Sequence, residues 1–104
     1  MYYNSLKFEW DPRKDQYNRR KHDVSFREAS TAFYDDDAIL FDDPNHSEEE
    51  ERCLLIGMTV FGRLLIVSHC YRKNDSVIRV ISARKATKTE ENYYLDTKRK
   101  RRFA

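Results

Sequence analysis

The second half of the chain contains three β-type segments joined by short turns, and this pattern constrains the fold more than any other. The segments are residues 52–58, 63–72 and 77–83. Residues 59–62 end in a glycine that suits a hairpin turn, and Asn74-Asp75 marks the second turn. Three consecutive strands with such connections predict an antiparallel meander. The apolar run 64–67 predicts that the middle strand is covered on both faces.

Two helices are predicted before the meander. Asp11 followed by Pro12 has the pattern of a helix N-cap with proline in the first turn, which predicts a helix over residues 12–21. Ser25 and Glu28 have the spacing of a capping box, which predicts a second helix over residues 26–33. Its buried side would be formed by Val24, Phe26, Ala29, Ala32 and Phe33.

Shorter elements complete the predicted fold. Residues 6–10 and 38–41 are short strand candidates, and Thr87 with Glu90 repeats the capping-box spacing before a last helix over residues 88–99. The basic residues at about 98–104 are expected to fray into a C-terminal tail. The sequence therefore predicts one α+β domain over residues 1–104. It has a mainly antiparallel sheet, two N-terminal helices and one C-terminal helix.

Length and cysteine use favour a small cytosolic protein. A chain of 104 residues fits one domain, and its longest apolar run is far shorter than the roughly 20 residues of a membrane span. Cys53 and Cys70 both lie in apolar runs, so we expect two reduced thiols inside the core. The absence of a CxxC pair in the sequence argues against a structural zinc site.

The charges are sorted along the chain although the net charge is only +2. Residues 35–51 contain nine carboxylates and no Lys or Arg, whereas residues 79–104 contain nine Lys or Arg against three carboxylates. A basic face of this kind attracts polyanions such as nucleic acid. An ordinary solvated surface is about as good an interpretation of these runs.

Residues 79–86 combine an apolar β-type run with an internal arginine and a terminal Arg-Lys pair. A guanidinium rarely enters such a strand without an anion or a carboxylate beside it, so the segment suggests a phosphate site. In a regular strand Arg79 and Arg84 would point to opposite faces. Both can reach one pocket only if a bulge or the strand end turns Arg84, and Arg79 is therefore the favoured buried-face arginine.

Several short motifs, in order along almost the whole chain, resemble the BrnT family of toxins from bacterial type II toxin-antitoxin systems. The motifs are Phe8-Glu9-Trp10-Asp11 with Lys14 and Asn18, Lys21-His22-Asp23-Val24-Ser25-Phe26 with Glu28-Ala29, Glu51-Arg52, Gly57-Met58-Thr59 with Gly62-Arg63-Leu64-Leu65, and Ile81-Ser82-Ala83-Arg84-Lys85-Ala86 with Glu90 and Tyr93. The resemblance implies a small ribonuclease with a RelE-like fold that cuts RNA and blocks translation. It also implies a ribbon-helix-helix antitoxin, which covers the toxin and binds the operator DNA.

Metal-independent RNA cleavage needs no cofactor but requires three chemical roles. The 2′-hydroxyl must lose a proton, the charge of the phosphorane must be stabilised, and the leaving 5′-oxygen must gain a proton. The catalytic candidates are His22, Glu51, Arg52 and Arg79. The candidates for RNA binding are Arg63, Arg84, Lys85, Lys88 and Tyr93.

Each candidate also has a structural interpretation. A histidine exchanges protons near neutral pH, but His22 could equally balance the dipole at a helix C-terminus. Glu51 could be a base, the partner of a site arginine or part of a surface ion pair. Arginines bind oxyanions well through two donors. Lys85 and Lys88 lie near the N-terminus of the last helix, where their charge opposes the helix dipole unless an anion binds there. Tyrosines on that helix more often pack in the core. His46 and His69 are weaker candidates, and a structural role is expected for His69.

Three other functions agree with the same sequence. A non-catalytic nucleic-acid-binding module would bind RNA and leave it uncut. A protein-interaction domain would use the charged segments to recognise a partner. A magnesium-dependent nuclease would use the carboxylates of residues 35–37 and 48–51, although such runs usually face solvent.

Overall fold

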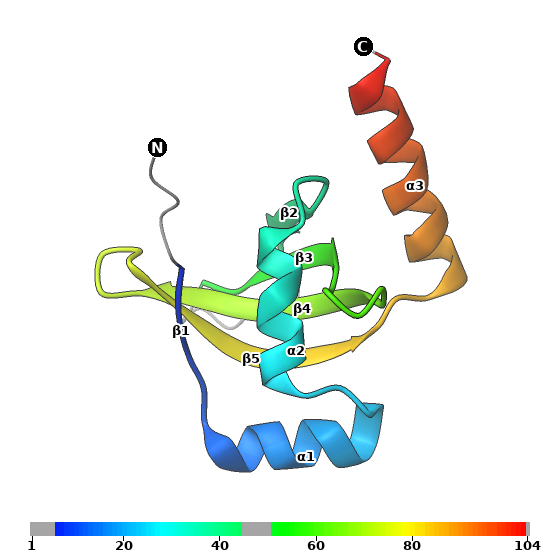
Figure 1. Cartoon of the computed structure of the whole chain (residues 1–104). Coiled ribbons are helices and arrows are strands. Elements are labelled where there is room, and N and C mark those ends of the chain that lie inside the picture. Colours follow the sequence, from blue (N-terminus) through cyan, green and yellow to red (C-terminus); the bar gives the residue numbers. More distant parts are fainter. Residues whose placement is uncertain (1–5, 45–50, 104) are drawn as a thin grey trace.

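The computed structural model describes residues 6–44 and 51–103, which form a five-stranded sheet with helices on both sides (Figure 1). The strands are β1 (Lys7–Glu9), β2 (Ile39–Asp42), β3 (Cys53–Met58), β4 (Leu64–Arg72) and β5 (Val77–Lys85). The helices are α1 (Pro12–His22), α2 (Phe26–Thr31), a 3-10 turn η1 (Ala32–Tyr34) and α3 (Lys88–Arg102). None of the described helices is long and apolar enough to cross a membrane.

The predicted meander is confirmed, but the sheet is mixed. Strands β3, β4 and β5 pair antiparallel in sequence order, and β2 pairs antiparallel with β3. Strand β1 pairs parallel with β5 at the other edge, with Lys7 opposite Val77. This pairing joins residues about 70 positions apart, so no local pattern predicts it. The strand order is β1-β5-β4-β3-β2, which places β4 at the centre.

Helix boundaries follow the predicted caps, with two differences. Asp11 and Thr87 cap α1 and α3, and Thr87 with Glu90 forms the full capping box. The predicted box of α2 is only half formed: Ser25 accepts from the Glu28 amide, but the Glu28 carboxylate binds Arg63 and Thr59 instead. Helix α3 continues through the basic run to Arg102, so most of the expected tail is helical.

The two faces of the sheet are covered differently. The core face packs against α2 and η1 through Val24, Phe26, Ala29, Ala32, Leu55, Leu65, Val67, Val80 and Ala83. The opposite face is here called the site face. Among residues 6–44 and 51–103 it is covered at one end, where Tyr94 of α3 packs on Ile39, Ile56 and Ile66. Residues 65–70 of β4 are all buried, as predicted for a strand covered on both faces. No other helix of the described residues covers the rest of the site face.

Helix α1 lies along the edge of β5, where β1 no longer pairs (Figure 1). The buried Asn18 side chain accepts from the Ala83 amide at 3.1 Å and donates to the Ala83 carbonyl at 2.8 Å. It also donates to the Val24 carbonyl at 2.9 Å. The Asn18 amide thus takes the place of a neighbouring strand and fixes α1 against the sheet.

Candidate functional site

A bulge in β5 turns Arg79 and Arg84 to the same face of the sheet. Ser68 lies opposite Ser82, whereas His69 lies opposite Val80, so Ile81 has no partner on β4. Arg79, which precedes the bulge in β5, lies opposite Cys70. Arg84, which follows the bulge, lies opposite Ile66. Alternate residues of β4 share a face, so both arginines lie on the site face. The sequence analysis required a bulge or the strand end to bring Arg84 to the same face as Arg79, and the structure has a bulge there.

The uncovered part of the site face forms an open pocket of about 290 Å³, which we call the arginine pocket. Its lining residues are His22, Asp43, Arg52, Leu54, Ile66, Ser68, Ser82, Ala83 and Arg84. They come from the end of α1, the end of β2 and the three strands of the meander. Two arginines and a histidine are thus gathered over a floor of small hydroxyl and aliphatic side chains.

His22 reaches this pocket because of the way α1 is attached. It lies one helical turn after Asn18, whose hydrogen bonds hold α1 against Ala83, itself a lining residue. The αL residue Asp23 ends the helix, and its amide donates to the Arg19 carbonyl. His22 therefore lies in the last turn of α1, where it can also balance the helix dipole, and it lines the pocket.

Arg84 is held in place by a carboxylate from the first turn of α3. Its two terminal nitrogens donate to Glu90 Oε1 and Oε2 at 2.7 and 2.8 Å. Glu90 also accepts from the Thr87 amide at 2.8 Å. The Arg84 hydrogen bonds, with help from Thr87 and against the effect of burial, lower the pKa of Glu90 to about 2. This corner was predicted to attract an anion, and within the protein the Glu90 carboxylate takes that position.

Arg79 lies beside the arginine pocket but does not line it. Its Nη1 donates to Glu9 Oε2 at 2.6 Å, and both side chains are about one-third exposed. Glu9 lies opposite Arg79 in the parallel pair of β1 and β5. The sequence favoured Arg79 over Arg84 as the arginine of the phosphate site, whereas the lining of the arginine pocket includes Arg84 and not Arg79.

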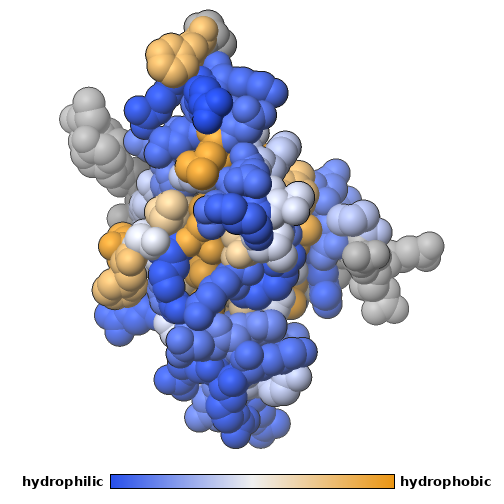
Figure 2. All heavy atoms as spheres, turned by 90° about the vertical axis from the view of Figure 1, so that its right-hand side faces the viewer, coloured by the Kyte–Doolittle hydropathy of each residue, from blue (hydrophilic) through white to orange (hydrophobic). Residues whose placement is uncertain are grey.

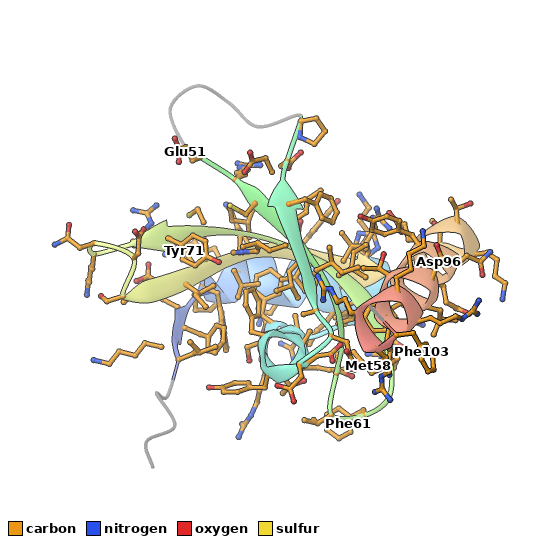
Figure 3. All side chains as sticks on the ribbon, turned by 90° about the horizontal axis from the view of Figure 1, so that it is seen from above. Glu51, Met58, Phe61, Tyr71, Asp96 and Phe103 are labelled. Carbon is orange, nitrogen blue, oxygen red and sulfur yellow. The ribbon has the colours of Figure 1, made fainter. Side chains whose placement is uncertain are left out.

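Arg52 and Asp43 form the wall of the pocket opposite α1. They are close along the backbone, because the Asp43 amide donates to the Arg52 carbonyl at 3.0 Å. Arg52 is half-buried. Glu51 is exposed and lies just before the first residue of β3, at the edge of the molecule (Figure 3). The pocket lining includes Arg52 but not Glu51.

Arg63 and Lys85 are placed on the other side of the sheet. Arg63 Nε donates to Glu28 Oε2 at 2.8 Å, and its Nη2 binds both Glu28 Oε1 and the Asp23 carbonyl. The Arg63 hydrogen bonds, against the effect of burial, lower the pKa of Glu28. Lys85 lies 3.9 Å from Asp23. Both cations therefore tie the hairpin and β5 to the end of α1.

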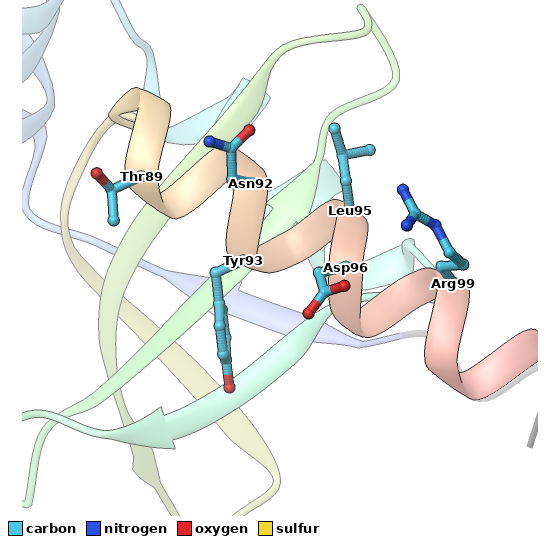
Figure 4. A pocket seen from close by; sticks show the side chains of 6 residues that line it. All are labelled: Thr89, Asn92, Tyr93, Leu95, Asp96 and Arg99. Carbon is cyan, nitrogen blue, oxygen red and sulfur yellow. The ribbon is translucent and has the colours of Figure 1, made fainter.

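Lys88 and Tyr93 belong to the solvent side of α3, which is mainly hydrophilic (Figure 2). Lys88 is exposed and pairs with Glu91 at 3.3 Å. Tyr93 is 54% exposed and lines a separate shallow groove with Thr89, Asn92, Leu95, Asp96 and Arg99 (Figure 4). The structure does not bring these two candidates to the arginine pocket.

Two other titratable residues have structural roles. His69 is fully buried between Phe33 and Tyr71, and burial lowers its pKa, as expected for a structural histidine. The Tyr94 hydroxyl donates to Asp35 Oδ2 at 2.6 Å. Cys70 is buried and Cys53 half-buried, on opposite faces of the sheet.

The carboxylates considered for magnesium are used differently where they can be described. Asp35 binds Tyr94 and the Met58 amide, and Asp37 lies near Lys98 and Arg102 of α3. Residues 6–44 and 51–103 contain no cluster of three or more His, Cys, Asp or Glu side chains that could hold a metal ion. His46 and residues 48–50 lie outside the described residues.

The sequence analysis missed the three other polar residues of the pocket, and it missed the supporting role of Asn18. Asp43 was assigned only to an acidic loop, and Ser68 and Ser82 were treated as ordinary strand residues. The available signal was that both serines interrupt apolar strand runs. Asn18 was named only as part of a motif, and no local pattern predicts its role because its partner Ala83 lies 65 positions away.

Comparisons with known proteins agree with this fold. The sequence profile of a family described as "Ribonuclease toxin, BrnT, of type II toxin-antitoxin system" matches residues 10–90. Among solved structures, the chain is similar to the crystal structure of the Brucella abortus ribonuclease toxin BrnT. The two share 24% sequence identity and a TM-score of 0.61, over 81% of this chain and 100% of the other. No curated protein matches the chain. The structural likeness supports the α+β fold.

Proposed function

Because this chain belongs to the BrnT family of ribonuclease toxins from type II toxin-antitoxin systems, we propose that it cleaves RNA in the arginine pocket without a metal ion. The observation that carries this proposal is the meeting of His22, Arg52 and Arg84 in one pocket. These residues come from α1, the start of β3 and β5, so only the fold brings them together. The same pocket is open to solvent, as a polymeric substrate requires.

The two arginines supply the phosphate-binding part of this site. A guanidinium presents a planar fork of donors that suits two oxygens of a phosphate. Glu90 binds one hydrogen of each terminal nitrogen of Arg84, and the capping box of α3 keeps Glu90 in that position. A phosphate would therefore bind the Nε side of this guanidinium, through the hydrogens that Glu90 leaves available. Arg79 lies on the same face, but its pair with Glu9 offsets much of its charge beside the pocket. Both lining arginines would stabilise the charge that grows on the phosphorane.

Cleavage then needs two proton transfers. A base takes the proton of the 2′-hydroxyl as the 2′-oxygen attacks phosphorus, and an acid donates a proton to the 5′-oxygen as its bond to phosphorus breaks. His22 performs one of these transfers in our proposal. Asp43 supplies the carboxylate that lines the pocket, and the assigned role of Glu51 stays a prediction from the sequence. The product on the 5′ side of the cut would carry a 2′,3′-cyclic phosphate.

The test is RNA cleavage by the purified chain in EDTA, compared with four substitutions. His22→Gln, Arg52→Gln and Arg84→Gln should each lower the cleavage rate by about a hundredfold or more, because each removes one transition-state interaction. Arg27→Gln is the matched control, since Arg27 is exposed on α2 and lies away from the pocket. A cyclic phosphate on the product checks the chemical route.

Other results would point to other functions. Bound but uncut RNA would favour the non-catalytic binding module. Cleavage only after magnesium is added would favour a metal-dependent nuclease. Unchanged cleavage by Asp43→Asn together with a loss in Glu51→Gln would move the carboxylate role to Glu51.

Family membership implies an antitoxin partner and an RNA substrate. We further infer that cleavage inhibits translation and that the antitoxin is a ribbon-helix-helix protein that neutralises this chain and binds operator DNA. This rests on the resemblance of the sequence motifs. In the cleavage assay, addition of the antitoxin encoded beside the toxin should stop RNA cutting, and the chain should reduce protein synthesis in a cell-free extract.

A further inference from the structure

Helix α1 has a basic outer surface that the pocket does not use. Its exposed cations are Arg13, Lys14, Arg19, Arg20 and Lys21. Tyr17 is also on this helix, and its side chain is 57% exposed. Such a large aromatic group on a polar helix does not contribute to the core of the described residues.

The attachments of α1 show which of these residues face the pocket side. Asn18 points to the edge of β5, and Asp15 points toward α2, because its Oδ1 accepts from the Phe26 amide at 2.8 Å. Successive residues of a helix are about 100° apart. Lys14, Tyr17 and Lys21 therefore form the flank of α1 opposite Asp15. That flank lies on the site-face side of β5, since α2 covers the core face.

These three side chains have the composition of a single-strand binding surface. The Lys21 ammonium lies 5.6 Å from the centre of the Tyr17 ring. A tyrosine ring offers a stacking surface to any base, and neighbouring lysines contact the phosphates on either side. Stacking on an exposed ring needs an unpaired base, so the chemistry selects a single strand over a duplex.

The flank also has a fixed position relative to the pocket. Asn18 bonds to both backbone groups of Ala83, and Ala83 lines the pocket. Tyr17 precedes His22 by five residues, which places the two about 7.5 Å apart along the helix axis. A stacked strand advances about 3.4 Å per nucleotide, so this distance corresponds to about two nucleotides.

We propose that Lys14, Tyr17 and Lys21 form an RNA subsite that binds a nucleotide about two positions away from the cleaved bond, with the base stacked on Tyr17. This inference rests on the proposed function, because the subsite is defined by its distance from the arginine pocket. It binds flanking RNA and takes no part in the chemical step. Long substrates therefore gain affinity from it, and a dinucleotide does not.

The test compares cleavage of a dinucleotide with cleavage of a single-stranded RNA of about ten nucleotides. Tyr17→Ala should raise KM for the long RNA by about tenfold, the contribution of one stacked base, with kcat unchanged. Tyr17→Phe keeps the ring and should behave as the parent chain. Lys14→Ala with Lys21→Ala should reduce the salt dependence of long-RNA binding, lowering the slope of log K against log salt by about 1.4. None of these variants should change dinucleotide cleavage.

Two control substitutions match the removed groups. Tyr34→Ala removes an equally exposed tyrosine (56%) on the α2 side. Arg27→Ala with Lys73→Asn removes two exposed cations away from α1, and asparagine suits the positive φ of Lys73. These controls should leave long-RNA binding and its salt slope unchanged.

The outcomes separate this inference from the proposed function. An unchanged KM for long RNA in Tyr17→Ala, with an active parent chain, would overturn the subsite and leave the nuclease proposal intact. Binding of long RNA that depends on Tyr17, without cleavage, would support the subsite and reject the nuclease proposal. If Tyr17→Ala weakens antitoxin binding and not RNA binding, the flank is a protein contact and the inference fails.

Discussion

At the scale of single residues, Asn18 shows how an uncharged side chain can organise a charged site. Its amide group satisfies both backbone groups of Ala83 at the edge of β5, beyond the residues that pair with β1. The same residue fixes the helix that carries His22 and the Tyr17 flank. One buried amide therefore sets the position of both parts of the proposed RNA-binding surface.

Asn18→Ala should destabilise the protein by about 3 kcal/mol, because it leaves buried backbone groups of Ala83 without hydrogen bonds. Asn18→Asp should be at least as harmful, since a carboxylate cannot donate to the carbonyls of Val24 and Ala83. Urea unfolding measures both effects. Asn92→Ala, an exposed change on α3, should alter the free energy of unfolding by less than about 0.5 kcal/mol. Equal small losses in all three variants would contradict this role of Asn18.

The same scale shows why the site was only partly predictable. The residue types in Arg79–Arg84 and at His22 carried a chemical signal in the sequence, and the pocket contains His22, Arg52 and Arg84. Whether Arg79 and Arg84 share a face of the sheet depended on a single unpaired residue, Ile81, whose bulge leaves no mark in hydrophobic alternation. Arg63 was a candidate for RNA binding, but in the structure it binds Glu28. The sequence could not show this ion pair because the two residues lie 35 positions apart.

At the scale of elements, α3 is fastened to the sheet by the acidic turn between η1 and β2. Tyr94 binds Asp35, and Lys98 and Arg102 lie near Asp37. Although burial opposes it, hydrogen bonds from Tyr94 and from the amides of Met58 and Asp37 hold the pKa of Asp35 below its usual value. The helix that orients Arg84 through Glu90 is thus positioned from its other side by carboxylates.

Tyr94→Phe should lower the free energy of unfolding by about 2 kcal/mol, because it removes a hydrogen bond to a charged group and keeps the buried ring. Tyr93→Phe is the neighbouring control, since Tyr93 is 54% exposed. Urea unfolding gives the loss of stability, and hydrogen exchange should show faster exchange in α3 of the first variant only. Similar exchange in both variants would mean that the Asp35 contact does not hold α3.

Local patterns predicted the elements better than their arrangement. The caps at Asp11 and Thr87 and the three strands of the meander are confirmed, because these signals lie within a few residues. The parallel pairing of β1 with β5 was not predictable, since nothing near Lys7 indicates a partner so far along the chain. The α2 box was predicted wrongly because Glu28 finds a stronger partner in Arg63.

At the scale of the whole molecule, carboxylates join separate layers of the fold. Glu28 links α2 to the β3–β4 hairpin, Asp35 links the acidic turn to α3, and Glu90 links α3 to β5. In each case hydrogen bonds to the charged form lower the pKa in the folded state. Protonation of these groups therefore weakens contacts between layers.

The protein should lose stability as the pH falls below about 4.5. A carboxylate whose pKa is lowered by folding stabilises the protein above its unfolded value, and this contribution disappears on acidification toward the folded value. For Glu90 that interval runs from 4.5 to about 2. Buried His69, with its lowered pKa, acts in the same direction at higher pH. Urea unfolding at a series of pH values measures the decline.

Glu90→Gln identifies the share of one carboxylate in this decline. Glutamine can still complete the cap of α3, but it does not form the charged pair with Arg84. The variant should be less stable than the parent at pH 7 and should depend less steeply on pH between 4.5 and 2. Glu91→Gln changes only an exposed pair with Lys88 and should follow the parent curve. A parallel decline in parent and Glu90→Gln would refute the assigned contribution.

The bulge at Ile81 has a consequence for how this segment can vary over evolution. An insertion or deletion between Arg79 and Arg84 would rotate one of the two arginines toward the core face, where Val80 and Ala83 now pack. A substitution within the segment changes one side chain and leaves the register intact. Selection on activity should therefore act more strictly on the length of this segment than on the identity of most of its residues.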